Sequence, residues 1–598
     1  MTDTNILNLE AEVLAHVLEY VDNESPRTMA AVARTCKYFN FVTRLVRYRH
    51  ITVHWDCERE SWIDMAGRKQ EEWETPELLQ GLRHLTACKG DLPALLLELG
   101  NGDLPGARNL CDNLDRLQSV LRNASNLKTL TWKTSYLPTK GIVETLQAHQ
   151  PKAKLDIFRA RRLGLAQIPL ESEKVLAAAT CLNSLSMTTI HATCIEDHLV
   201  FHMILKSAPN LEFASILSFP QMESYSPVVT FLRPNLDSWF PPDLEGKQST
   251  SLRHLTLDGW GISAECLEFW SEYVNLASLR GLKCSRGPIY SSFFDRAPKI
   301  LTNLKSFSIN LGAELRSDVY LGAAKEYIAT CPPLETLSLW SWRGKVPLPT
   351  ILNRHGATLR DLQLHECEDP EGIHLRDAFS AEELQSIRLS CPRLKVLTLD
   401  LNRVSAQLRV EEYEAIFDEL RKMNLDKIQI YVENGLPWFH QADRRSRSKE
   451  SSWMEALRRM NDDQTDIRLP SGCDFDGAFG HALPVTVKKS DLGWSHLSRD
   501  EELTLLPPTS YVALCRFLIG AWKIIFGSRT WGPRQLDVKL GEWEKKKYQP
   551  TNHYVQELGR DSRAWVRARP HERDDMVGEC FVELECCGGD HKRRFSSR

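Results

Sequence analysis

The sequence predicts an α/β fold in which short strands and helices alternate along a repeat solenoid, curved like a horseshoe. Two observations predict it. The pattern L-x-x-L-x-L recurs from the middle of the chain onward, and the segments between its copies carry helical hydrophobic periodicity. The last two leucines of each copy lie two residues apart, so on a strand both side chains point to the same, buried side. Because no single copy can bury its own apolar face, stacked neighbours must share a core.

Six copies stand in near register, and a seventh, weaker copy fills a gap between the first two. Their starts are 25 to 35 residues apart, mostly near or just above the upper end of the roughly 20–29 residues typical of leucine-rich repeats. Inserted loops explain the irregular lengths. The copies begin at Leu252, Leu279, Leu304, Leu334, Leu359, Leu394 and Leu425, with looser copies at Leu127, Leu182 and Leu211.

The connecting segments are predicted to be helices that end just before the next strand. Residues 263–273 and 411–420 are amphipathic at helical spacing. Pro209, Pro332 and Pro392 each stand shortly before a repeat copy. Proline cannot continue a helix interior, so these three residues indicate helix ends that lead into strands.

The first fifty-odd residues read as three short amphipathic helices ahead of the repeats. In the first helix the apolar residues recur at i, i+3, i+4 and i+7, which is one stripe at helical period. Ser25 and Pro26 supply an N-cap and a first-turn proline for the second helix. The apolar positions are Leu14, Val17, Leu18 and Val21, then Met29, Val32, Cys36 and Phe39, then Phe41, Val42, Leu45 and Tyr48.

This block resembles an F-box. The matching segments are residues 9–14, 17–22, 32–39 and 48–51, with Glu10 where the family usually has proline. F-box proteins dock onto the Skp adaptor of a cullin-RING ubiquitin ligase and present a substrate through the domain that follows. The resemblance implies adaptor-binding residues at Leu9, Leu14, Val17, Leu18, Val32, Cys36 and Phe39.

The repeats resemble the leucine-rich repeats that follow the F-box in one large family of ubiquitin-ligase receptors, in a divergent form common in fungal proteins. The resemblance implies a non-catalytic substrate receptor of an SCF-type ligase, acting in ubiquitin conjugation and protein degradation, with the Skp adaptor, a cullin and an unknown substrate protein as partners. An alternative stays open. The N-terminal helices also suit a solenoid cap on a leucine-rich-repeat scaffold with no ubiquitin role.

Strand alternation also predicts where a partner binds. If the leucines point inward, the residues between them form the concave surface. That row is polar and mildly acidic, and aromatic residues of the kind that dominate protein–protein binding energy lie in it or just past it. For the tryptophans that follow the strands, folding back over the repeat edges is an equal alternative. The candidate substrate-binding residues are Asp258, Trp260, Asn310, Trp340, Trp342, His365, Asp400 and Tyr431.

Beyond residue 436 the repeat register stops. Residues 436–505 are polar and irregular, which indicates a loop or linker. An apolar helix near residues 511–527 and three alternating segments after it predict a small α+β region. The predicted division is an F-box-like module at 1–55, a helical linker with a first irregular repeat at 56–125, the solenoid at 126–435, the linker at 436–505 and the α+β region at 506–598.

Composition and motif searches exclude several function classes. The net charge of −4 gives no basic field for nucleic acid, and no apolar run reaches the length of a membrane span. The N-terminus does not read as a signal peptide and the sixteen cysteines contain no C-x-x-C pair, so a cytoplasmic and/or nuclear protein with reduced thiols is expected. No catalytic motif is found. The spacing of Cys580, Cys586, Cys587 and His591 does not suit zinc, so we expect no catalytic site, metal or cofactor.

Overall fold

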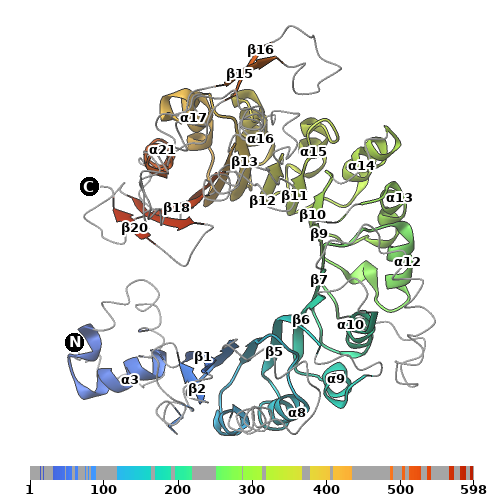
Figure 1. The fold of residues 1–598 in the computed structure, drawn as a ribbon, viewed down its shortest axis with the longest axis vertical. Coiled ribbons are helices and arrows are strands. Elements are labelled where there is room, and N and C mark those ends of the chain that lie inside the picture. The colour runs from blue at the N-terminus through green and yellow to red at the C-terminus, as the bar shows by residue number, and fades with distance from the viewer. Residues whose placement is uncertain are drawn as a thin grey trace, which may run out of the picture. The chain divides into compact units, whose positions relative to one another are not determined.

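The computed structural model describes the chain in segments that fall into two compact units, residues 1–306 and 307–598 (Figure 1). Each unit is described by itself. The described residues are Leu14, Leu18, 31–47, 49–56, 61–64, 74–75, 79, 82–88, 117–162, 169–189, 195–218, 251–285, 287, 289–312, 318–366, 378–404, 408–433, 485–488, 502–505, 511–526, 535–540, 564–570, 580–586 and 593–596.

The first unit contains a sheet whose strands run parallel in chain order. Strand β2 (Ser61–Asp64) is an exception, because it pairs antiparallel with β1. The parallel strands are β1 (His50–Asp56), β3 (His84–Cys88), β4 (Thr129–Lys133), β5 (Lys154–Ala160), β6 (Leu182–Thr189), β7 (Phe213–Ser218), β8 (His254–Asp258) and β9 (Gly281–Ser285).

Helices of the first unit connect these strands. Figure 1 shows α8, α9, α10 and α12 on one face of the sheet. Ser263 caps α12, since its hydroxyl accepts the Cys266 N–H at 3.4 Å. The helices are α3 (Lys37–Arg47), α8 (Lys140–His149), α9 (Glu171–Ala177), α10 (Ile195–Ser207), α12 (Ala264–Ser271), α13 (Ser291–Ile300) and the 3₁₀ turn η3 (Leu276–Ser278).

One backbone contact recurs from repeat to repeat. The carbonyl before a strand accepts two N–H groups from the start of the next strand: Arg49 O accepts from Arg83 and His84, and Arg253 O accepts from Arg280 and Gly281. The same arrangement recurs in the second unit at Lys395 O. It satisfies buried backbone groups at the point where each strand begins, and so sets the register of the neighbouring strand.

The second unit continues with strands of the same kind and ends in antiparallel strands. Strands β11 to β14 and β17 pair in parallel, then β17, β18, β19 and β20 pair antiparallel in sequence order. Strands β15 and β16 pair antiparallel by themselves. The strands are β10 (Ser306–Asn310), β11 (Thr336–Trp340), β12 (Asp361–His365), β13 (Val396–Leu401), β14 (Lys427–Val432), β15 (Val485–Lys488), β16 (Glu502–Leu505), β17 (Gln535–Leu540), β18 (Ala564–Pro570), β19 (Cys580–Cys586) and β20 (Arg593–Ser596).

Five α-helices are described in the second unit. The last of them, α21, packs on the previous helix through Phe517, whose ring centroid lies 5.5 Å from Tyr413 and 5.7 Å from Phe417. The helices are α14 (Asp318–Thr330), α15 (Leu348–His355), α16 (Ala381–Ser390), α17 (Glu414–Lys422), preceded by the 3₁₀ turn η4 (Val410–Tyr413), and α21 (Tyr511–Phe526). No described helix is long and apolar enough to cross a bilayer.

The α/β class is confirmed, and the repeat copies coincide with strands. Each of the ten copies predicted from leucine spacing has its own strand, from β4 to β14. The helices α10, α14 and α16 end two residues before Pro209, Pro332 and Pro392 respectively, as predicted. The horseshoe curvature and the five-part division of the chain stay predictions.

The sequence predicts a small α+β unit at residues 506–598, packed on the last repeats. Its strand β17 pairs in parallel with β14 over six positions, from Lys427 opposite Gln535 to Val432 opposite Leu540. The repeat register therefore resumes after residue 534, because Leu536 and Val538 continue the buried rows of the preceding strands. The strand pattern of the sequence does not indicate this pairing.

The rows of buried leucines give the first prediction. Leu337 of β11 is fully buried, whereas Leu389 of α16 is 68% exposed. We expect Leu337→Ala to lower the free energy of unfolding by about 2–5 kcal/mol, because it leaves a cavity in the shared core. Leu389→Ala should change it by less than about 0.5 kcal/mol. Chemical denaturation of both variants checks this, and equal losses would contradict the assignment of the core.

A buried histidine gives the second prediction. His355, at the end of α15, accepts the Leu334 N–H at Nδ1 (3.2 Å) and donates from Nε2 to Ile328 O at 2.9 Å. Burial lowers the pKa of His355 to about 4. The folded protein holds this ring neutral, while the unfolded chain protonates it near its ordinary pKa of about 6.5.

Stability should therefore fall as pH drops from about 6.5 towards 4, because the unfolded state binds the proton first. His198 and His202 of α10 act in the same direction, since burial lowers both pKa values. Denaturation midpoints measured across this pH window check the slope. The variant His355→Gln, which cannot titrate, should show a shallower slope; an unchanged slope would rule out this contribution.

Candidate functional site

The second unit brings four of the predicted binding residues into one row across neighbouring strands. Strand pairing sets Trp340 opposite His365, Asp400 opposite Tyr431, and Tyr431 opposite Lys539. A hydrogen bond joins His365 to Asp400 and so completes the row. We call these five residues the His365 row. They come from β11, β12, β13, β14 and β17, one from each strand.

A histidine–carboxylate pair lies at the centre of the His365 row. Nδ1 of His365 is 2.5 Å from Oδ1 of Asp400, and the Glu366 N–H donates to Oδ2 of the same carboxylate at 2.6 Å. Both His365 and Asp400 are fully buried. A buried carboxylate is tolerated when each oxygen accepts a hydrogen bond, and this one meets that condition.

Aromatic rings enclose the pair. The Tyr431 ring lies over the imidazole of His365 with centroids 3.9 Å apart, and the Trp340 ring meets it edge-on at 4.8 Å. Lys539 Nζ lies 4.8 Å from the centroid of Tyr431 and donates to its hydroxyl at 3.0 Å. The ammonium thus combines a cation–π contact with a hydrogen bond on one ring.

This arrangement fixes the imidazole but keeps it away from solvent. A carboxylate on Nδ1 selects the tautomer and ring orientation that a general base requires. In this structure, however, His365 and Asp400 are fully buried and Tyr431 nearly so, while Trp340 and Lys539 are partly exposed. A partner that approaches the His365 row would therefore contact Trp340 and Lys539. The buried His365–Asp400 pair holds the rings of Trp340 and Tyr431 in place.

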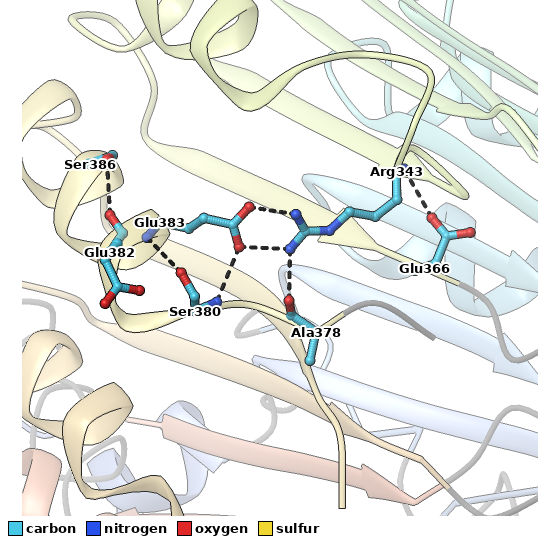
Figure 2. A network of polar contacts seen from close by, with 7 residues as sticks. All are labelled: Arg343, Glu366, Ala378, Ser380, Glu382, Glu383 and Ser386. Carbon is cyan, nitrogen blue, oxygen red and sulfur yellow. Dashed lines mark hydrogen bonds and ion pairs between the residues drawn. The ribbon is translucent and has the colours of Figure 1, made fainter. Parts of the chain in front are cut away.

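A loop that follows β11 is held next to the row by Arg343. Its guanidinium donates to both carboxylate oxygens of Glu383, at 2.5 and 2.8 Å, and to Ala378 O at 3.0 Å. Its backbone N–H donates to Glu366 at 3.0 Å. Figure 2 shows this arginine between the loop residue Glu366 and the first turn of α16, where Ser380 and Glu383 form a capping box.

Burial shifts the pKa of two carboxyl groups at the ends of β12, Glu366 just after His365 and Asp361 at the start of the strand. Burial raises the pKa of Glu366, and the Arg343 N–H together with Lys345 partly offsets the rise. Burial also raises the pKa of Asp361, which a hydrogen bond from Gln363 partly offsets. Glu366 is the link between the Arg343 loop and Asp400, because its side chain accepts from one and its N–H donates to the other.

Of the two alternatives for Trp260 and Trp342, exposure on the strand face or folding back over the repeat edges, the structure shows the second. Trp260 is 1% exposed and Trp342 is 2% exposed. Trp260 packs edge-on against His198 at 4.5 Å, and Trp342 stacks on Phe379 at 5.8 Å. Both rings fold back over the repeat edges, because burying an indole against neighbouring rings removes a large apolar area from water.

The other predicted residues occupy different places. Asp258 of β8 is partly exposed and belongs to the first unit. Asn310 of β10 is partly exposed too, and its side chain accepts the Gly312 N–H at 2.8 Å, a local turn contact. The structure therefore brings together Trp340, His365, Asp400 and Tyr431 only. Their shared position does not show that they bind a substrate, so the substrate-binding roles of these residues stay predictions.

Sequence reasoning missed Lys539 and Arg343. The alternation of Leu536, Val538 and Leu540 did predict a strand, which places Lys539 on its outer face. That pattern does not indicate that the strand pairs with β14, so it could not place Lys539 beside Tyr431. For Arg343 the sequence holds no signal, because its partners lie 35 and 40 residues away.

The N-terminal helices hold a small apolar cluster of their own. Leu14, Leu18, Val42 and Val46 are buried together. Val32, Tyr38 and Phe39 are partly buried against that cluster, and Cys36 is also partly buried. Cys36 stands just before α3 and its sulfur accepts the Phe39 N–H at 3.4 Å. Phe41 is 46% exposed. Leu9 and Val17 lie outside the described residues.

Comparisons with known proteins give no identification: no family model matches the chain, and no curated protein matches it. Among the described residues, no group of three or more histidine, cysteine, aspartate or glutamate side chains is placed to hold a metal ion. The side chains of Cys580, Cys586, Cys587 and His591 lie outside that description.

The His365–Asp400 pair gives the third prediction. Asp400→Ala removes the acceptor of both the imidazole and the Glu366 N–H, so it should lower the free energy of unfolding by at least about 2 kcal/mol. Asp400→Asn keeps one acceptor oxygen and should cost less. Chemical denaturation compares the two variants, and equal losses would show that the hydrogen bonds do not account for the effect.

Proposed function

We propose that the chain is the substrate-recognition subunit of an SCF-type ubiquitin ligase. Its F-box-like N-terminal helices dock onto the Skp adaptor, and the polar faces of its leucine-rich-repeat strands hold a substrate protein. The chain itself contributes no catalytic group. It acts by holding substrate lysines near the ubiquitin-charged enzyme, so the rate gain comes from proximity within the complex.

The observation that carries this proposal is the exposed apolar surface of the N-terminal helices. Phe41 is 46% exposed on α3, and Val32, Tyr38 and Phe39 are only partly buried. Val32, Tyr38 and Phe39 pack against the buried Leu14, Leu18, Val42 and Val46 but keep part of their own surface exposed. Apolar surface that stays exposed beside such a cluster favours a partner, here the adaptor.

The burial of the N-terminal residues changes which of them we propose to contact the adaptor. Leu14 and Leu18 are buried within the helical cluster, so they hold the module together instead of reaching a partner. Substitution of Leu14 by aspartate would place a charge in this core and unfold the module. An exposed residue such as Phe41 is the better probe of the docking face.

One observation favours the alternative, a repeat scaffold with no ubiquitin role. Helix α3 ends at Arg47, and β1 begins at His50 and pairs in parallel with β3. The last N-terminal helix thus leads directly into the first strand of the sheet, as a solenoid cap does. A cap needs no partner, so the two proposals differ in what the exposed surface binds.

Affinity copurification of the intact chain with Phe41→Glu tests the proposal. The charge on an exposed face should remove the Skp adaptor and the cullin from the copurified proteins while the chain stays folded. The matched control is Asn40→Glu, the adjacent exposed residue, which should retain both partners.

Absence of the adaptor and cullin from the intact chain's partners would refute the ligase role and favour the cap. Retention of both by Phe41→Glu would refute the docking face. A truncation that checks the whole module should end at residue 47, because β1 pairs with both β2 and β3 and its removal would expose a sheet edge.

A further inference from the structure

In the first unit a group of exposed cationic and aromatic side chains lies on the sheet face that carries the polar residues. Lys133 is the last residue of β4, one position beyond Trp132, where the pairing with β5 ends, and it lies next to Phe158 of β5, which is 49% exposed. Lys133 Nζ lies 5.9 Å from the centroid of the Phe158 ring, and Arg159 Cζ lies 5.3 Å from it. Two cations therefore flank one open ring.

A bulge in β5 produces this group. The register between β5 and β6 shifts between Ile157 and Ala160, and Arg159 adopts a left-handed backbone with φ 52°. The extra residue leaves both Phe158 and Arg159 exposed, where regular alternation would turn one of them inward. A left-handed conformation is unfavourable for arginine, and such strain is concentrated at binding and switch sites.

The cations of this group are not neutralised locally. No ion pair within the described part of the chain involves Lys133, Lys154 or Arg159, all of which are exposed. Arg162, by contrast, is buried in an ion pair with Glu173 at 2.7 Å. On the same face Asp156 accepts a hydrogen bond from Asn183 at 2.8 Å. The excess charge of this part of the face is therefore positive.

A second exposed ring continues the face two strands away. Phe213 of β7 is 40% exposed and stacks on His254 of β8 with centroids 4.7 Å apart and planes at 5°. The next residue in that row is Gly281, where a Cβ would clash with Nδ1 of His254. The missing side chain gives His254 the room it needs to lie flat on Phe213.

The distance between Phe158 and Phe213 sets the length of a bound segment that contacts both rings. Phe158 and Phe213 are two strands apart across the sheet and about two residues apart along it, so roughly 12 Å separates them. An extended chain that advances about 3.3 Å per residue covers this distance with about four residues. Carboxylates on such a chain would lie within reach of Lys133 and Arg159.

We propose that this face of the first unit binds an extended acidic protein segment. Its carboxylates pair with Lys133 and Arg159, and its apolar side chains cover Phe158 and Phe213. The inference rests on one part of the proposed function, that the polar faces of the strands bind a substrate protein. It does not depend on whether the N-terminal helices bind the adaptor. It adds the chemical class of the segment that this unit binds.

A protein segment fits this face better than a nucleic acid does. Binding to a phosphate backbone draws its affinity from many neutralised phosphates, on the order of 6–10 contacts. Around Phe158 this face offers Lys133, Lys154 and Arg159, and Lys283 of β9 adds one more cation, within a chain of net charge −4. Few cations beside exposed rings suit a short segment that combines carboxylates with apolar side chains.

The test is fluorescence anisotropy of the full chain with a labelled extended peptide that alternates aspartate and phenylalanine. A peptide with lysine in place of aspartate is its counterpart. We expect the acidic peptide to bind and the basic one not to, with an affinity that falls as salt rises. Failure of the acidic peptide to bind, or equal binding of a single-stranded oligonucleotide, would overturn the proposal.

Variants locate the binding. Arg159→Gly removes the cation and also relieves the left-handed backbone, so the fold should be at least as stable while affinity falls about tenfold, or about 1.4 kcal/mol. Phe158→Ala should have a similar effect. Lys299→Glu, on the exposed side of α13, is the control and should change affinity less than about twofold.

Charge reversal separates the electrostatic contribution from a change of fold. The double variant Lys133→Glu with Arg159→Glu should lose the acidic peptide and gain the lysine peptide. Unchanged affinity of Arg159→Gly for the acidic peptide would refute the site. Adaptor copurification and peptide binding are measured separately. Absence of the adaptor would refute the ligase proposal, whereas absence of acidic-peptide binding would refute only this one.

Discussion

Parallel strand pairing in register is the constraint on which the rest of the structure depends. In the second unit Leu337, Leu362, Leu397, Ile428 and Leu536 occupy one buried row across five strands. Side chains alternate along a strand, so a register set by this row also sets the opposite face. Each residue of the His365 row lies three positions after a residue of the buried row, and therefore on the opposite face of the sheet. Because the buried residues are in register, the residues of the His365 row lie side by side.

The repeat strands could be predicted because their signal is local. Leu362 and Leu364 are two residues apart in the sequence, and that spacing alone places both on the buried side of β12. The positions of strands β3 and β5 were not predicted, because Leu85 with Ala87, and Leu155 with Ile157, make only partial copies of the pattern. Proline positions fixed the helix ends for an equally local reason, the missing N–H.

The candidate sites were predictable only in part. Alternation placed His365, Asp400 and Tyr431 on the correct face, yet their burial depends on rings from neighbouring strands. Trp260 and Trp342 turn inward because His198 and Phe379 offer surfaces to cover, and both lie far from them in the sequence. The group around Phe158 was missed for another reason: it depends on a bulge, and one extra residue leaves no pattern to read.

The position of β17 has a consequence for the order of folding. The contact between His365 and Asp400 spans 35 residues, whereas the contact between Tyr431 and Lys539 spans 108. Closing the longer loop costs roughly 1 kcal/mol more in chain entropy. Contacts distant in sequence also form slowly. The strands up to β14 can therefore assemble first, and the lysine that covers Tyr431 joins them later, after about a hundred further residues of chain have been made.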